Sequence, residues 1–153
     1  MASVWKPYEQ NLTRLTEEFV RNRVLEWLSK QGYGIISRVK TISEHGVDIK
    51  VRKTKSYSYF VIEVKGDPPT TKHPEKIRHP AFLSALGEIV QRVKHERHYR
   101  YALALPSSFQ KLVFRRLPWV AAKKIGLEVL LVDAKGKVTR VTWREIKEHQ
   151  TKR

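Results

Sequence analysis

The sequence predicts an α/β fold in which a mixed β-sheet is flanked by helices. Short apolar runs that alternate with period two, at 33–39, 46–53 and 59–66, indicate strands, and longer segments with helical spacing lie around them. A short connection between two strands favours an antiparallel hairpin, whereas a helical connection favours parallel neighbours, and this chain has both. We find no internal repeat or linker in the 153 residues, which are expected to form one domain over 1–153.

The first half of the chain is expected to hold one helix and three strands. After an arm at 1–11, the helix runs from about Thr13 to Lys30 and ends near Gly32, a helix stop. The strands "YGIISRV", "GVDIKVRK" and "YFVIEVKG" follow. Because only the turn "KTKSYS" separates the second strand from the third, these two are predicted to form a hairpin.

The second half of the chain is expected to alternate helices and strands. A long connection, "DPPTTKHPEKIRHP", leads to a helix over about Ala81–Arg97, and connections of this length are often functional. The strand "YALALP" comes next, followed by a helical segment that is broken at Pro118 and ends at Gly126. The strand "LEVLLVDA" then turns at "KGK" into "VTRVTW".

Composition narrows the class of partner. The chain carries 31 Lys and Arg against 15 Asp and Glu, a net charge of +16, which favours a polyanion such as nucleic acid. The alternatives are a ribosomal-type structural protein or an acidic membrane surface, but the basic residues are spread over the whole chain rather than along one helix. No apolar run is long enough to span a membrane, no secretory signal is visible and there is no cysteine, so a cytoplasmic protein is expected.

A candidate site lies in the third strand, "VIEVKG". Glu63 and Lys65 share the face opposite Ile62 and Val64, and charges in an apolar strand must be paired or bind a ligand. Asp48 lies across the hairpin, so two carboxylates can converge on one Mg²⁺, which prefers oxygen ligands. A lysine beside such a site can orient or deprotonate a water, or stabilise negative charge, as hydrolysis of a phosphodiester requires.

These residues resemble the D-x(n)-[DE]-x-K signature of the PD-(D/E)XK nuclease superfamily, the restriction-endonuclease-like fold, with Val47 where that signature has proline. The segments "ALGEIVQRV", "YALALP" and "LEVLLVD" also resemble XisH-type proteins, and less closely Mrr-type and Holliday-junction-resolvase-type members. The resemblance covers most of the chain. It implies that Asp48 and Glu63 bind metal and that Lys65 is the catalytic lysine. The alternative is that Glu63 and Lys65 form a surface ion pair that contributes little.

Two further positions enter through the same resemblance. Many members place a glutamate of the first helix at the metal, and Glu17 lies on the apolar stripe of that helix; the alternative is a helix-terminal acid that stabilises the helix dipole. Relatives often place a glutamine on the helix after the active strand. Gln91 is one candidate, and Glu88 stands where XisH-like sequences have their glutamine. The alternative is a solvated helix face whose core side carries Leu86, Val90 and Val93.

The function expected from the sequence is Mg²⁺-dependent cleavage of DNA, with Mn²⁺ as a substitute. The alternative is a DNA-binding accessory or regulatory protein on the same fold, with weak or no cleavage. A homodimer is one expected assembly, since small nucleases often dimerise to cut both strands. Basic side chains on the third helical segment are expected to contact phosphates or to form a solvated face: Lys111, Arg115, Arg116, Lys123 and Lys124. Zinc at His95 and His98 is disfavoured, because no cysteine accompanies them.

Overall fold

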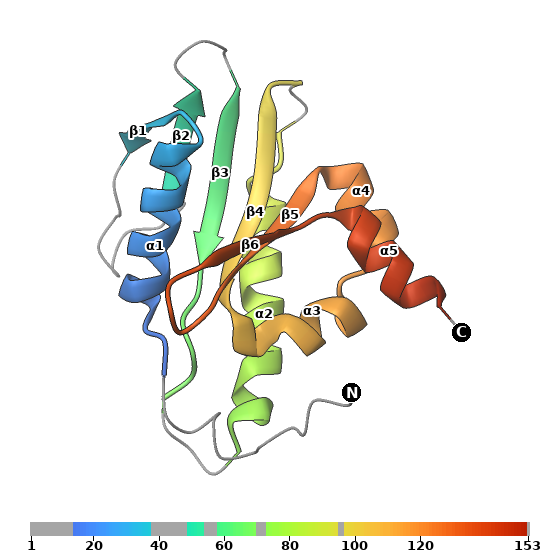
Figure 1. Ribbon diagram of the computed structural model, residues 1–153. Helices are drawn as coiled ribbons and strands as arrows, with labels where there is room; N and C mark the ends of the chain where they lie inside the picture. Colours follow the sequence, from blue (N-terminus) through green and yellow to red (C-terminus); the bar gives the residue numbers. More distant parts are fainter. Residues whose placement is uncertain (1–13, 38–48, 54–57, 70–72, 95–96, 153) are drawn as a thin grey trace.

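The computed structural model describes residues 14–37, 49–53, 58–69, 73–94 and 97–152 (Figure 1). The arm at 1–11, the turn at 54–57, Asp48 and His95 lie outside the described residues. The elements are α1 (Glu17–Lys30), β1 (Tyr33–Ser37), β2 (Ile49–Lys53), β3 (Tyr59–Val64), α2 (Pro74–Gln91), β4 (Tyr99–Pro106), η2 (Ser107–Phe109), α3 (Gln110–Arg116), α4 (Trp119–Ile125), β5 (Leu127–Val132), β6 (Val138–Val141) and α5 (Trp143–Thr151).

The six strands form one mixed sheet in the order β1-β2-β3-β4-β5-β6. β1 pairs antiparallel with β2 and β2 antiparallel with β3, so the predicted hairpin is confirmed. β3, β4 and β5 run parallel to one another, as expected for strands joined by helices, and β6 returns antiparallel on β5. The predicted α/β class, a mixed sheet flanked by helices, is therefore correct.

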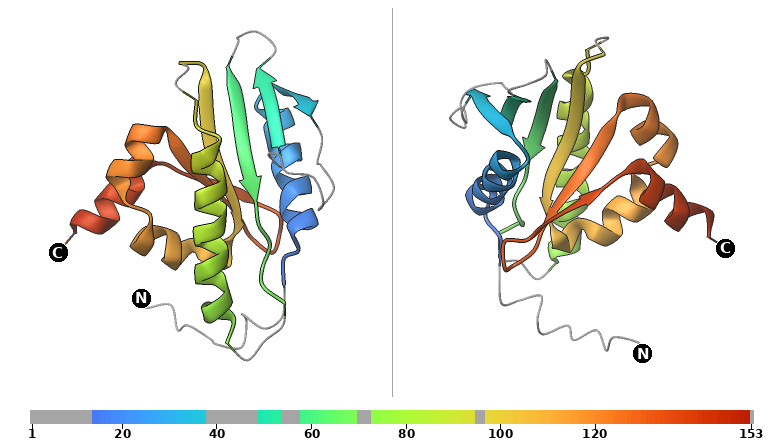
Figure 2. Two further views of the ribbon diagram at one scale, coloured as in Figure 1. Left: turned by 180° about the vertical axis from the view of Figure 1, so that it is seen from behind. Right: turned by 45° about the horizontal axis from the view of Figure 1, so that its top comes forward.

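Helices cover both faces of the sheet, and α1 and α2 lie on opposite faces (Figure 2). The α1 face buries Val20, Val24 and Leu28 against Ile62 and Val64 of β3. On the other face, α2 and the helices after β4 pack on the alternate side chains of the strands, which include Val61, Tyr101, Leu103, Leu105 and Val129. Alternation along β3 therefore decides which helix each of its side chains meets.

The bounds of α2 differ from the prediction. The helix begins at Pro74, inside the segment expected to be a loop, and ends at Gln91 rather than near Arg97. Pro74 is tolerated because it stands in the first turn, where its missing N–H would have no intrahelical partner. Pro80 lies six residues further along, inside the helix, and the helix continues through it. Two prolines so close together favour a loop. The helix forms nevertheless, because burial of its apolar face outweighs this local preference.

The core face of α2 was predicted correctly only at Leu86, which is partly buried and packs against the core. Phe82, Ala85 and Ile89 are buried, whereas Val90 and Val93 are 44% and 38% exposed. The first set has the i, i+3, i+7 spacing of one helix face, and the second set lies to the side of it. The phase of the helix decides which polar residues of α2 approach β3.

The C-terminal region contains a helix, α5, that was not predicted from the sequence. The segment after β4 breaks at Pro118 into α3 and α4, and α4 ends at Gly126 with φ of 75°, both as expected. Beyond β6, the chain enters α5 through a capping box in which Thr142 and Glu145 hydrogen-bond each other's backbone and side chain. The pattern "TWRE" carries this signal, and Ile146 anchors the helix in the core.

Candidate active site

Glu63 is the one polar or charged residue in the buried core of the described chain. It lies near the end of β3, pairs with Leu103 of β4 in the parallel ladder and is 4% exposed. Because Val61 belongs to the core on the α2 side, alternation places the Glu63 side chain on that side too. A buried carboxylate has a high cost unless it is hydrogen-bonded, protonated or bound to a cation.

Lys65 and Glu88 complete a small cluster with Glu63. The Lys65 Nζ lies 3.6 Å from Glu88 Oε2, and Ser84 Oγ donates to Glu88 Oε1 at 3.4 Å. A side-chain hydrogen bond with Glu63 and the charge of Lys65 lower the pKa of Glu88, although burial acts in the opposite direction. Two carboxyl groups in contact either share a proton or hold a cation, since both cannot otherwise be ionised at low cost.

Gln91 does not join this cluster. It is the last residue of α2 and is exposed, three residues beyond Glu88 and so rotated away by about 60° on the helix. Of the two positions considered on this helix, Gln91 and Glu88, it is therefore Glu88 that lies beside Glu63 and Lys65. The core stripe of Phe82, Ala85 and Ile89 could have indicated this from sequence, because Glu88 flanks that stripe.

Glu17 lies at the same end of β3 but on a different layer. Its side chain is 41% exposed and lies 3.6 Å from the Arg21 guanidinium, and its helix packs on the sheet face opposite Glu63. It is also the first residue of α1, after the N-cap Thr16, where an acid stabilises the helix dipole. Both interpretations of Glu17 therefore stay open.

The backbone after Lys65 is held by close contacts. A Cβ on Gly66 would lie 2.3 Å from the Glu17 nitrogen, so only glycine allows the chain to pass the start of α1. Asp67 then accepts a hydrogen bond from the Leu15 backbone N–H at 2.9 Å and donates its own N–H to the Leu15 carbonyl at 2.7 Å. These contacts fix the end of β3 and, with it, the position of Lys65.

Among the residues that the structure describes, no group of three or more His, Asp or Glu side chains is arranged to hold a metal. The donor set here is Glu63 with Glu88. Their contact gives oxygen ligands of the kind that Mg²⁺ and Mn²⁺ prefer, and Mg²⁺ commonly uses only one or two protein carboxylates. The described residues thus supply two carboxylates of the type that a divalent cation binds, and Asp48 lies outside them.

Aromatic and basic side chains lie together at the opposite end of the central strands. Tyr59 and Tyr99, at the starts of β3 and β4, stack with centroids 4.9 Å apart. The Lys50 ammonium lies 5.1 Å from the Tyr59 ring centroid and Lys94 lies 5.5 Å from that of Tyr99. Lysines held over aromatic rings are favourable pairs, and the same combination suits contacts with nucleic-acid backbone and bases.

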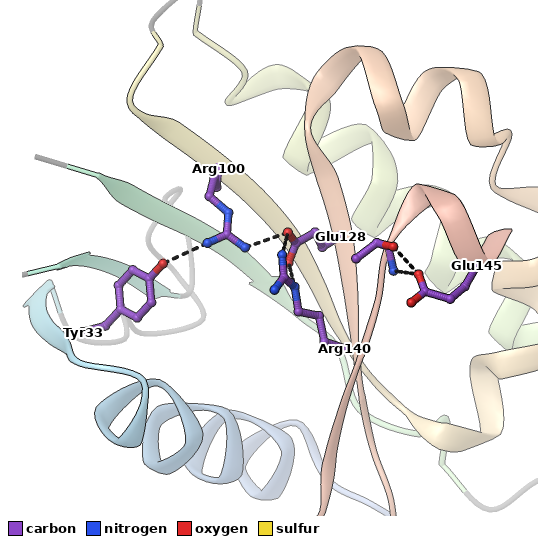
Figure 3. Close-up of polar contacts among 6 residues, drawn as sticks. Tyr33, Arg100, Glu128, Arg140 and Glu145 are labelled. Carbon is purple, nitrogen blue, oxygen red and sulfur yellow. Dashed lines mark hydrogen bonds and ion pairs between the residues drawn. The ribbon is translucent and has the colours of Figure 1, made fainter. Parts of the chain in front are cut away.

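A second charged network, drawn in Figure 3, stabilises the sheet. Arg100 and Glu128 alternate in phase with Ala102 and Leu130, which belong to the core on the α1 side, so the network lies on the sheet face opposite Glu63. Glu128 of β5 accepts hydrogen bonds from Arg100 of β4 at 2.6 Å and from Arg140 of β6 at 2.6 and 2.7 Å. Arg100 also donates to the Tyr33 hydroxyl at 3.0 Å. The hydrogen bond to Glu128 raises the pKa of Arg140. This network joins four strands, and its charged groups bind one another. We therefore infer that it stabilises the sheet.

No protein-family model matches this chain, and no curated protein matches its sequence. Two crystal structures are similar in fold. An XisH family protein from Nostoc punctiforme has a TM-score of 0.53 and 20% identity, with 81% of this chain and 98% of that chain covered. A fdxN element excision controlling factor from Anabaena variabilis has a TM-score of 0.53 and 21% identity, with 82% and 98% covered.

The likeness is one of fold. It extends over nearly the whole of both neighbours and shows that this chain shares their α/β architecture. At about one-fifth sequence identity, it assigns no activity. Nor, in the described residues, does any helix have both the length and the apolarity needed to cross a membrane.

Proposed function

We propose that this chain is a metal-dependent endonuclease that hydrolyses DNA phosphodiesters. The observation that carries the proposal is the buried Glu63 carboxylate in contact with Glu88, with the Lys65 ammonium 3.6 Å from the same Glu88 side chain. Carboxylate oxygens for a cation and an adjacent ammonium are the groups that phosphodiester hydrolysis needs. The net charge of +16 supports nucleic acid as the substrate class.

The carboxylates would hold Mg²⁺ or Mn²⁺. The bound cation supplies Lewis-acid polarisation of the scissile phosphate. Glu63, held near the end of β3 by the parallel ladder with β4, offers a ligand whose position changes little on binding. Glu88 reaches it from α2, and Ser84 orients that carboxylate through a hydrogen bond.

Asp48 is proposed as the further ligand. The antiparallel register of β2 with β3 runs Arg52↔Tyr59, Val51↔Phe60, Lys50↔Val61 and Ile49↔Ile62. Ile49, the residue after Asp48, thus pairs with Ile62, the residue before Glu63. The D-x(n)-[DE]-x-K resemblance implies that Asp48 and Glu63 share the metal, and Asp48 itself lies outside the described residues.

Lys65 has the role of stabilising charge and orienting the attacking water. Its Nζ is held by Glu88 and its backbone N–H donates to the Ala104 carbonyl at 3.0 Å. An ammonium positioned in this way can donate to a phosphate oxygen on which charge develops during the reaction. The contacts of Gly66 and Asp67 hold the backbone on its other side.

A second candidate is a DNA-binding accessory protein without robust cleavage. The observation in its favour is the fold shared with the Anabaena protein, which is described as an excision controlling factor. Such a protein needs the basic surface but has no use for the buried Glu63 beside Glu88. This cluster therefore favours the nuclease.

The test is cleavage of supercoiled, linear and four-way-junction DNA with Mg²⁺ or Mn²⁺ by the wild type and Glu63→Gln. We expect the wild type to nick or cut at least one substrate and Glu63→Gln to cut none. DNA binding should fall steeply with salt through release of counterions. Binding without cleavage by the wild type would favour the accessory protein, and sedimentation with and without DNA would test the expected homodimer.

A further inference from the structure

A cavity of about 380 Å³ lies between the first half of α2 and the segment formed by η2 and α3. Both walls of the cavity follow a parallel strand in the sequence: α2 comes after β3, and η2 begins directly after β4. The cavity is thus at the carboxyl end of the β3–β4 pair. In open α/β sheets this edge is where ligands commonly bind.

The lining of the cavity is strongly basic. Arg78 from α2 and Lys111, Arg115 and Arg116 from the α3 segment contribute positive charge, against one acidic side chain, Glu75. Basic groups gathered in a concave site repel one another in the absence of an anion and focus positive potential for one. Arginine in particular matches the oxygens of a phosphate group.

Arg78 is positioned by the segment that follows Lys65. Its Nη2 lies 3.8 Å from Asp67 Oδ1, an ion pair longer than a hydrogen bond. Asp67 also accepts a hydrogen bond from Ser108, another residue of the cavity wall, at 2.5 Å. Within the described residues the buried Arg78 Nε has no hydrogen-bond partner. Asp67 therefore orients the Arg78 guanidinium, and its Nε–H is left to donate a hydrogen bond to a ligand.

We propose that this cavity binds a phosphate group of a nucleic-acid strand. The inference rests on the proposed nucleic-acid substrate and adds a site separate from Glu63 and Glu88. A volume of this size holds about one nucleotide-sized group, and Leu112 gives an apolar part of the wall for a sugar or base. Asp67 is only two residues from Lys65, about 7 Å of extended chain, so a strand held here would pass the proposed active site. The phosphate could be a terminal monoester or an internal diester, and both offer the same oxygens.

The test compares two double variants that each remove two exposed charges. Arg115→Ala with Arg116→Ala alters the cavity, whereas Lys135→Ala with Lys137→Ala removes two exposed charges from the segment between β5 and β6. Binding of short single-stranded DNA, with a 5′-phosphate or a 5′-hydroxyl, is measured by fluorescence anisotropy in EDTA at several salt concentrations. Competition by inorganic phosphate and pyrophosphate is measured in parallel, and circular dichroism checks that each variant is folded.

The cavity variant should lose about tenfold or more in affinity, because hydrogen bonds to charged groups are lost with the charges, while the control loses only a few-fold. A preference of the wild type for the 5′-phosphate that disappears in the cavity variant would identify the terminal group, and equal losses on both strands would identify an internal one. Equal losses in the cavity and control variants, or no wild-type binding, would overturn the proposal. Since no metal is present, this result is independent of whether the protein cuts DNA.

Discussion

The backbone of Glu17, at the start of α1, lies directly against Gly66, at the end of β3. A Cβ built on Gly66 would lie 2.3 Å from the Glu17 nitrogen and 2.8 Å from the Thr16 carbonyl carbon, closer than real Cβ atoms come to other atoms. The atoms in the way are backbone, so no rotamer change can relieve the contact. The first helix and the strand that carries Glu63 and Lys65 therefore fix each other's position.

Gly66→Ala should destabilise the protein by about 1–3 kcal/mol, the range for an extra methyl group in a well-packed region. It should also reduce cleavage by more than stability explains, because the shift needed to admit the methyl group moves Lys65. Urea unfolding monitored by circular dichroism gives the first quantity and a DNA-cleavage assay the second.

Gly87→Ala is the matched control. Gly87 lies within α2, and a Cβ there would have nothing within 4 Å. This substitution should stabilise the helix by about 0.5–1 kcal/mol. If both alanine variants changed the free energy of unfolding alike, the close approach at Gly66 would not determine stability.

Glu128 should matter more to stability than a typical surface acid. Glu128→Gln weakens three hydrogen bonds from Arg100 and Arg140, and we expect a loss of about 1–2 kcal/mol. The control is Glu148→Gln, whose ion pair with Lys152 at 3.2 Å is fully on the surface and should contribute at most about 0.5 kcal/mol. Urea unfolding of both variants provides the comparison, and equal effects would contradict the role of the network.

The capping box of α5 gives a pH-dependent prediction. Burial raises the pKa of Glu145, but hydrogen bonds from Thr142 outweigh it, so the pKa is lowered overall. A carboxyl with a depressed pKa in the folded state contributes stability above its unfolded pKa and loses it as the pH falls through the folded value. Glu145→Ala should therefore cost about 0.5–1 kcal/mol at neutral pH and less in acid, as measured by urea unfolding. A cost that does not change with pH would contradict the ionised cap.

The alternation of β3 and the hairpin were predictable because each depends on a few neighbouring residues. "VIEVKG" fixes which side chains share a face, and "KTKSYS" is too short for anything but a turn. The same local rules placed Pro118 and Gly126 at helix boundaries. These signals are strong because the backbone chemistry of glycine and proline is not altered by tertiary packing.

The predictions that differ from the structure concern the helix α2 and the C-terminal helix α5. Val90 and Val93 are apolar but exposed, so hydrophobicity alone gave the wrong phase, and only packing of Phe82, Ala85 and Ile89 on the sheet sets it. The choice of Gln91 rests on residue type, because relatives carry a glutamine on this helix, whereas the structure places Glu88 beside Lys65. The contact of Gly66 with α1 depends on tertiary packing and has no local sequence signal.

Glu88 and Gln91 are therefore predicted to differ in function. Glu88→Gln removes the carboxylate that contacts Glu63 and Lys65, and it should reduce Mn²⁺ affinity and cleavage by about 10–100-fold, the range for residues that support a metal site. Gln91→Ala should leave both unchanged. Isothermal titration with Mn²⁺ measures the affinity without relying on activity. A larger effect at Gln91 than at Glu88 would show that Gln91 is the residue of α2 that supports the site.

Lys65→Met separates an enzyme from a DNA-binding protein. Methionine retains much of the lysine stem but removes the ammonium that is placed beside Glu88, so Mg²⁺-dependent cleavage should be abolished. DNA affinity should be almost unchanged, because Lys65 is one of 31 Lys and Arg residues. Loss of this group is expected to raise the barrier by several kcal/mol, with each ~1.4 kcal/mol a factor of ten in rate. Lys76→Met, which removes the same charge from an exposed position of α2, serves as the control and should cut normally. The measurements are cleavage of supercoiled and four-way-junction DNA and anisotropy titrations of the same proteins. A Lys65 variant that cuts as fast as the wild type would remove Lys65 from the mechanism, and a wild type that binds both substrates but cuts neither would make this fold a DNA-binding one.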